Sequence, residues 1–373
     1  MVPTRILHIS KTAELDQRLI MRCVMLKDDS KTTPASPVGR ETIPLEKMKR
    51  SENQSRPKGK IGFVGLGRMG TAMAANLAAG GAYVTAYVRR PDRMQKLEAL
   101  HLKPTTDFTK LFECNVVISM VSDDDAAREI VFGRSDTGLV GLANGLTPGA
   151  IHLSMSTIST ATASQLASEH ARCRQGYVAA PVFGNPTAAK ARQLFIVASG
   201  APADVESCRQ LFAEIGQQTF VIGTNPADAN LFKLLGNMMT ATALETLGEV
   251  VTVIRKRGLD PKLFMDLMTS TFYGGRVHRI YGDKIASQNY EPGFIMPLAL
   301  KDVDLALTEA ESAGVPLPSL GVVRDRMITG IARGYAELDW TALGLVAAEE
   351  AGIHAAQSPP ISRVASQQCS QKE

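Results

Sequence analysis

Two sets of residues have the types and spacing that chemistry requires. Gly65, Gly67 and Gly70 follow an apolar, β-prone run at the spacing G-x-G-x-x-G, and an Ala- and Met-rich helix begins at once after them. Such a loop turns tightly, lets the backbone approach a pyrophosphate and packs the helix close to the sheet, and the helix N-terminus holds the phosphates. The pattern predicts a dinucleotide site. The alternative is a glycine-rich turn that serves packing alone.

Lys233 and Asn237 are four residues apart on a long predicted helix, and therefore share one face of it. Burial on the apolar side of a helix lowers the pKa of a lysine, which suits it to proton transfer. Beside a nicotinamide, such a lysine would protonate the oxygen that develops when hydride reaches a carbonyl carbon. The alternative is a solvated lysine with no catalytic role.

Two loops leave predicted strands where ligands usually bind in open α/β sheets. The first carries Ser156 and Thr157, after a strand at 151–154, and the second carries Val182, Phe183 and Gly184. Hydroxyl and backbone N–H groups in such loops can hold a substrate carboxylate. Capping of the next helix by Ser159 or Thr160 is the alternative for the first loop.

The residues at the end of the second predicted strand bear on which dinucleotide is bound. An acidic residue usually contacts the adenosine ribose at this place, but Arg89 and Arg90 stand there. Two guanidinium groups would bind a 2′-phosphate through charge-assisted hydrogen bonds. The sequence therefore favours NADP(H) over NAD(H), with solvated arginines as the alternative.

The pattern of elements predicts how these groups are positioned. Strands and helices alternate over 59–223, which predicts a Rossmann-type, doubly wound parallel sheet. A long helix over 227–257 and shorter helices follow, so 224–353 is expected to be an all-helical substrate and oligomerisation domain. We expect residues 1–58 to be a disordered extension and 354–373 a polar tail.

Composition excludes several classes of protein. Residues 1–58 hold 12 of the 41 basic and 7 of the 37 acidic residues, which leaves 29 against 30 in the rest of the chain. This balance argues against a nucleic-acid partner. The scattered cysteines imply no metal site, and no apolar run is long enough for a membrane span. We expect a cytoplasmic protein; organellar targeting by residues 1–58 stays open, although their acidic residues are untypical of transit peptides.

The motifs together resemble those of the β-hydroxyacid dehydrogenase family, which includes 3-hydroxyisobutyrate dehydrogenase, tartronate semialdehyde reductase and glyoxylate/succinic semialdehyde reductase. The segments that carry the resemblance are GFVGLGRMGTAMAANL, SMSTIS, NLFKLLGNMM and LKDVDLAL. The resemblance implies a 6-phosphogluconate dehydrogenase-like fold with a long interdomain helix. It makes Lys233 and Asn237 catalytic, and it assigns substrate contacts to Ser156, Thr157, Val182, Phe183, Gly184 and Lys301. The expected cofactor contacts are Gly65, Leu66, Gly67, Arg68, Met69, Gly70, Arg89, Arg90, Val121, Ser122, Asp123, Ser156 and Lys301.

The chain departs from the family pattern in three segments, one of which is Arg192-Gln193-Leu194, where the family commonly has a glycine-containing turn. Where the family's substrate loop reads like A-P-V-S-G-G, this chain has Phe183 in place of the serine and Asn185 in place of the last glycine. The family's asparagine pair is reduced to Gly236 and Asn237. A bulkier or less polar substrate follows from the loss of a hydroxyl donor.

The expected function is an NADP(H)-preferring oxidoreductase that interconverts a small β-hydroxyacid and its semialdehyde or keto acid, with NAD as a second acceptable cofactor. An imine reductase of the same architecture and a non-catalytic dinucleotide-binding scaffold are the alternatives, and the lysine at position 233 argues against both. The partners expected are a small carboxylate or carbonyl substrate and further copies of the chain, as a homodimer or homotetramer.

Overall fold

The computed structural model describes residues 46–49, 59–134 and 138–353. Within them, one sheet has ten strands in the order β1-β12-β11-β9-β8-β5-β2-β3-β4, with β10 beside β11. Their bounds are β1 Glu46–Lys49, β2 Lys60–Val64, β3 Tyr83–Tyr87, β4 Lys103–Thr105, β5 Val116–Ser119, β8 Ile151–Ser154, β9 Gly176–Ala179, β10 Val182–Phe183, β11 Leu194–Gly200 and β12 Gly216–Gly223. The short strands β6 (Gly133–Arg134) and β7 (Leu139–Val140) pair with each other.

Most neighbouring strands of the sheet run parallel. The pairs from β4 through β3, β2, β5 and β8 to β9 are all parallel, as is the pair β11–β12. This confirms the predicted doubly wound sheet. Antiparallel pairings occur only at one end of the described sheet, where β11 pairs with β9 and β10, and β12 with β1.

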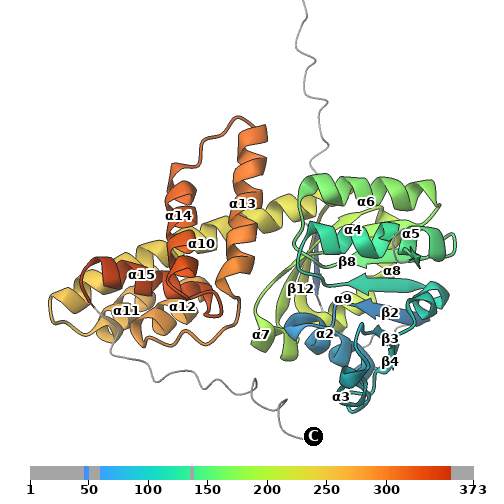
Figure 1. The fold of residues 1–373 in the computed structure, drawn as a ribbon, viewed down its shortest axis with the longest axis horizontal. Coiled ribbons are helices and arrows are strands. Elements are labelled where there is room, and N and C mark those ends of the chain that lie inside the picture. The colour runs from blue at the N-terminus through green and yellow to red at the C-terminus, as the bar shows by residue number, and fades with distance from the viewer. Residues whose placement is uncertain (1–45, 50–58, 135–137, 354–373) are drawn as a thin grey trace, which may run out of the picture. The chain divides into compact units, whose positions relative to one another are not determined.

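Helices cover both faces of the sheet, as Figure 1 shows. One face packs against α2 (Arg68–Ala79) and α9 (Arg209–Ile215), with Met73, Leu77 and Phe212 in the core. The other packs against α4 (Asp124–Phe132), α5 (Leu142–Gly145) and α6 (Thr160–Arg172). Shorter helices complete the sheet region (residues 59–223): α3 Met94–Glu98, α7 Pro186–Lys190 and α8 Pro202–Ser207. Both faces of the strands are therefore apolar, as a parallel sheet requires.

The helical region (residues 224–353) begins with α10 (Pro226–Lys256), close to the predicted 227–257. Ala227 and Ala229 pack in the core of the sheet region, whereas Leu234 and Val251 pack in a separate core of the helical region. One helix thus joins the two cores. The later helices are α11 Pro261–Ser270, α12 Arg276–Ala286, α13 Met296–Ser312, α14 Pro318–Ala332 and α15 Leu343–Glu350.

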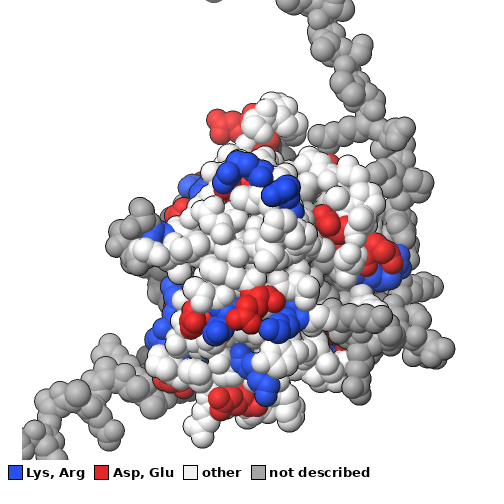
Figure 2. Space-filling view, turned by 90° about the vertical axis from the view of Figure 1, so that its right-hand side faces the viewer, with Lys and Arg blue, Asp and Glu red and all other residues white. Residues whose placement is uncertain are grey.

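Most of the expected extension over residues 1–58, and the tail over 354–373, lie outside the described residues. Within the extension, however, residues 46–49 form β1, which pairs with β12 at the edge of the sheet. In the described part of the chain no helix is long and apolar enough to cross a membrane. Figure 2 shows basic and acidic side chains interspersed among uncharged ones on the described part of one face.

Candidate active site

The three glycines of the loop after β2 meet different surroundings. Gly65 has a φ of +88°, and a Cβ atom there would lie 2.2 Å from the Met120 carbonyl oxygen. A Cβ at Gly70 would lie 2.1 Å from the Gly65 carbonyl oxygen, so these two positions require glycine for the turn and for close packing. A Cβ at Gly67 would meet nothing within 4 Å. No side chain caps α2 at Gly67, which leaves the first N–H groups of the helix for an anion.

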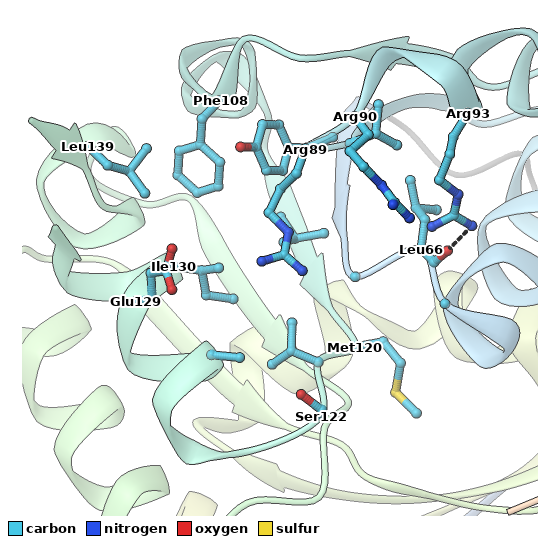
Figure 3. A pocket seen from close by; sticks show the side chains of 17 residues that line it. Leu66, Arg89, Arg90, Arg93, Phe108, Met120, Ser122, Glu129, Ile130 and Leu139 are labelled. Carbon is cyan, nitrogen blue, oxygen red and sulfur yellow. Dashed lines mark hydrogen bonds between the residues drawn. The ribbon is translucent and has the colours of Figure 1, made fainter. Parts of the chain in front are cut away.

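A pocket of about 360 Å³ opens beside this loop, and Figure 3 shows its lining. Gly65, Leu66 and Gly67 form one part of the wall, and the end of β3 forms another. Arg89 points into the pocket, with Arg90 and Arg93 beside it. The Arg93 guanidinium donates a 2.7 Å hydrogen bond to the Leu66 carbonyl, so it ties the β3 end to the glycine loop.

The charges in this pocket suit a phosphorylated ribose. Arg89 and Arg90 are exposed, and neither has a side-chain hydrogen bond or ion pair with another described residue. Two such guanidinium groups can bind a 2′-phosphate through charge-assisted hydrogen bonds. Glu129 of α4 also lines the pocket, but it lies outside the β3 end where a ribose-binding acid usually stands.

The predicted cofactor contacts after β5 divide into two kinds. Val121 and Ser122 line the pocket. Asp123 does not, and its carboxylate caps α4 by accepting a 2.8 Å hydrogen bond from the Ala126 N–H. The Ser122 hydroxyl also donates to Asp123 and, as the largest cause, lowers its pKa. Arg68 and Met69, in the first turn of α2, are likewise not among the pocket-lining residues.

The loops after β5 and β8 are joined by one hydrogen bond. The Val121 N–H donates to Ser156 Oγ at 2.8 Å, and Ser156 is fully buried. The next residue, Thr157, accepts a 2.6 Å hydrogen bond through its carbonyl from Lys301 Nζ on α13. Contacts therefore run without a break from the pocket beside the glycine loop to the helical region.

Lys301 is the half-buried end of a polar chain, which we call the lysine network (Lys233, Asn237, Lys301 and Asp302). Lys233 Nζ donates to Asn237 Oδ1 at 2.9 Å, and Asn237 Nδ2 donates to Asp302 Oδ2 at 2.6 Å. The other Asp302 oxygen is 2.8 Å from Lys301 Nζ. The network joins α10 to α13 and, through Thr157, to the sheet region.

Lys233 is 7% exposed, so its ammonium group is held away from bulk solvent. Burial lowers the pKa of Lys233 from 10.5 to about 8. Asp302 opposes this shift and Lys301 adds to it. A lysine with a pKa near neutrality can both give and take a proton at physiological pH.

The second predicted substrate loop reaches the same lysine from β10. The Phe183 ring lies over Lys233 Nζ, 4.4 Å from the ring centroid. Val182 is buried in the core of the sheet region, and Gly184 has a φ of +140°, which favours glycine. The structure thus brings Phe183, Lys233 and Asn237 together, with Thr157 and Lys301 at the far end of the lysine network.

Comparisons with known proteins place this geometry in a family. Residues 60–223 match the NAD-binding domain of 6-phosphogluconate dehydrogenase, and residues 227–356 match the NAD-binding domain of NADP-dependent 3-hydroxyisobutyrate dehydrogenase. An uncharacterized oxidoreductase of Bacillus subtilis, YfjR, is 35% identical over 287 residues, which cover 76% of this chain and 98% of the relative. The chain belongs to the β-hydroxyacid dehydrogenase family.

Two further similarities agree with this assignment. The 2-hydroxy-3-oxopropionate reductase of Escherichia coli is 28% identical over 76% of this chain and 95% of its own. The fold is that of 3-hydroxyisobutyrate dehydrogenase from Salmonella typhimurium, with a TM-score of 0.70, 19% identity, and coverage of 78% of this chain and 100% of that one. As a β-hydroxyacid dehydrogenase family member, this chain is an NAD(P)-dependent oxidoreductase of the class that acts on CH–OH groups.

Two residues of this β-hydroxyacid dehydrogenase site were not among the predicted contacts. Asp302 joins Lys301 to Asn237. Arg93 was not singled out, and its bond to Leu66 depends on a tertiary approach. Among the described residues, no group of three or more His, Cys, Asp or Glu side chains could hold a metal ion.

Proposed function

We propose that this protein is an NADP(H)-preferring oxidoreductase that interconverts a small β-hydroxyacid and its semialdehyde or keto acid. The observation that carries the proposal is Lys233: a buried lysine on α10, 2.9 Å from Asn237 Oδ1, with a pKa lowered to about 8. A lysine in this state suits a proton donor to a carbonyl oxygen. For a lysine without a chemical role, burial of the ammonium group would only cost desolvation free energy.

The cofactor fits the pocket beside the glycine loop. Gly65, Gly67 and the first N–H groups of α2 would hold the pyrophosphate, and Arg89 and Arg90 would hold the 2′-phosphate. Val121 and Ser122 would line the path from there toward Lys233. When bound, the reduced nicotinamide supplies the hydride for the carbonyl carbon.

The protein's own residues handle the proton and the charge. Lys233 Nζ donates a proton to the carbonyl oxygen, where negative charge develops, and recovers it from solvent in the next cycle. Asn237 Oδ1 holds the ammonium group in place, and Asp302 fixes the Asn237 amide from the other side. Lys301 and the Thr157 loop provide the positive charge and donors for a substrate carboxylate.

The substrate class is supported by the relatives. The Escherichia coli relative is named a reductase of 2-hydroxy-3-oxopropionate, a small semialdehyde acid.

The side chains exposed on α10 and α11 support assembly into a homodimer or homotetramer as part of the proposal. Met239 is 73% exposed, Leu263 69% and Leu267 56%, and such a surface is typical of a contact between subunits.

A screen of the purified protein tests the proposal. Small β-hydroxyacids are offered with NADP⁺ or NAD⁺, and cyclic imines with NADPH. We expect hydroxyacid oxidation with a lower KM for NADP⁺. Turnover of imines alone would make the protein an imine reductase, and binding of NADPH without any turnover would make it a scaffold.

The cofactor preference has its own matched test. Replacing Arg89 and Arg90 together by alanine (R89A/R90A) removes the groups expected to bind the 2′-phosphate. Each charge-assisted bond contributes about 1.5–3 kcal/mol, so the KM for NADP⁺ should rise about tenfold or more. In the same variant the KM for NAD⁺ should change less than about twofold. The control is Lys96→Ala, which replaces an exposed lysine outside the pocket lining, and its KM values for NADP⁺ and NAD⁺ should both change less than about twofold. Equal loss with both cofactors would contradict the assignment.

A further inference from the structure

Two of the departures from the family pattern, Phe183 and Gly236, touch each other in space. They lie 53 residues apart, one on β10 and one on α10. A Cβ atom on Gly236 would lie 2.4 Å from Cζ and 2.6 Å from Cε1 of the Phe183 ring. Real Cβ atoms do not approach other atoms so closely, so the ring holds its place only because residue 236 has no side chain.

The Phe183 ring is held by contacts with the core of the sheet region and with α10. It packs against the core of the sheet region on the face covered by α4–α6. It also lies over Lys233 Nζ at 4.4 Å from the ring centroid, well within cation–π distance. Gly236 is three residues beyond Lys233, hence one turn along the same face of α10. The ring, the ammonium group and the gap at Gly236 therefore form one packed unit.

With Lys233 as the proton donor, this unit would lie next to the reacting carbonyl. A phenyl ring offers no hydrogen-bond donor, and a hydroxyl group placed against it would lose its water without gaining a partner. An apolar group placed there would instead gain contact area with the ring. The charged group that suits a carboxylate, Lys301, lies at the other end of the lysine network, where it contacts the Thr157 loop.

We propose that Phe183 and Gly236 are a coupled specificity element, which selects a hydroxyacid or semialdehyde with an apolar branch beside the reacting carbon over one with a hydroxyl group there. The proposal rests on the proposed function and names its substrate class more closely. The aromatic ring provides the selecting surface, and Gly236 provides the space that the ring needs.

The first test compares four 3-hydroxypropanoates that differ only at C2: hydrogen, methyl, phenyl or hydroxyl. For the wild type, kcat/KM is expected to be highest for an apolar branch and lowest for the hydroxyl, with a spread of about tenfold or more. In Phe183→Ser the value for the apolar branches should fall about tenfold and that for the hydroxyl should rise. If the variant changes all four values by the same factor, Phe183 does not select the branch.

The second test examines the coupling between the two residues. Gly236→Ala should displace the ring, and overpacking of this kind should lower the melting temperature by about 2–8 °C. It should also lower kcat/KM for the apolar branches. In the Phe183→Ser background the same change should leave the melting temperature unchanged or raise it by up to about 3 °C, since the atoms that clash are gone and alanine is a better helix former than glycine. Additive effects in the two backgrounds would overturn the coupling.

The outcomes separate this proposal from the proposed function. If the wild type oxidises none of the four hydroxyacids with either cofactor, the proposed function fails. If it oxidises them and only the C2 ranking disagrees, the specificity element fails and the function stands. The melting temperatures report the Phe183–Gly236 contact even for a variant without activity.

Discussion

The lysine network, in which Lys233, Asn237 and Asp302 are buried, and a second, fully buried polar network beneath α6 differ in charge. In the second, the histidine network, Ser119 Oγ lies 2.9 Å from His152 Nε2 and His152 Nδ1 lies 2.9 Å from His170 Nε2. His170 Nδ1 in turn lies 2.7 Å from Gln175 Oε1. All four side chains are at most 7% exposed, as is that of Lys233.

The hydrogen bonds of the histidine network assign it a single neutral state. Gln175 Nε2 donates to the Ala143 and Leu146 carbonyls, so Gln175 Oε1 accepts from His170 Nδ1–H. His170 Nε2 must then accept from His152 Nδ1–H, and His152 Nε2 from the Ser119 hydroxyl. Burial lowers the pKa of His152 well below its usual value, and that of His170 in the same direction.

The two networks also differ in whether their polar groups all have partners within the protein, which burial alone does not reveal. Each ring nitrogen of the histidine network has one partner inside the protein, so nothing is left for a ligand. Among the described residues, Lys233 Nζ has one hydrogen-bond acceptor, Asn237, although an ammonium group carries three N–H bonds. We therefore infer that the closed, neutral network serves stability and the open, charged network serves catalysis.

The sharpest way to break this comparison is Lys233→Met. The variant keeps an unbranched side chain but removes the proton donor, so kcat should fall by about 10²–10⁴-fold, the range typical of general acid catalysis. The KM for NADP⁺ should stay within about twofold, because no pocket-lining residue changes. The free energy of unfolding should change by less than about 1 kcal/mol, since loss of the Asn237 bond is offset by removal of a buried charge.

Lys256→Met is the matched control for this variant, because Lys256 is an exposed lysine of the same helix. Its kcat and its unfolding free energy should both equal those of the wild type. Steady-state kinetics and urea denaturation check both variants. An unchanged kcat in Lys233→Met would end the catalytic interpretation of the lysine network.

The opposite result is expected for His170→Leu. The change leaves His152 Nδ1–H and Gln175 Oε1 without partners in a buried site, and each such group costs about 1–3 kcal/mol. The free energy of unfolding should therefore fall by about 2–5 kcal/mol. The kcat of the protein that remains folded should equal that of the wild type, because no residue of the lysine network is touched.

His278→Leu controls for the loss of a histidine in general. His278 is a half-buried residue of α12, outside the histidine network. Its replacement should change the unfolding free energy by less than about 0.5 kcal/mol. A fall in kcat for folded His170→Leu would show that the histidine network also acts on the active site.

The sequence predicts the parts of the site that local patterns carry. The glycine spacing, the four-residue separation of Lys233 and Asn237, and the arginines after β3 are all readable within single segments. Asp302 could not be assigned in this way, because it meets Asn237 only through the packing of α13 on α10, 65 residues away.

The contact of Phe183 with Gly236 also depends on tertiary packing and could not be predicted from a single segment. Each residue departs from the family pattern, but only the structure shows that one makes room for the other. The fold divides similarly: the parallel strands and the helices α10–α15 follow from periodicity. Edge pairings such as β1 with β12 depend on which backbones meet, and no local pattern encodes that.

The two networks should also respond to pH on opposite sides of neutrality. Reduction needs Lys233 protonated, and its pKa is lowered to about 8 by burial. The kcat/KM for reduction should therefore fall about tenfold per pH unit above that value, while oxidation, which needs the neutral amine, should level off there. Asn237→Ala should shift the pH at which kcat/KM for reduction begins to fall, because it removes the side chain that links Lys233 to Asp302 by hydrogen bonds.

The histidine network should show its titration in stability instead of rate. Folding holds His152 and His170 neutral, so below the ordinary histidine pKa of about 6.5 the unfolded chain binds more protons than the folded one. Stability from this source is complete above pH of about 6.5 and is lost as the pH falls below it. The acid slope of the unfolding free energy should thus be shallower in His170→Leu than in the wild type, while the alkaline limb of kcat/KM stays where it was. An acid slope that His170→Leu leaves unchanged would mean that other groups carry it, and the histidine network would then contribute hydrogen bonds without a proton-linked component.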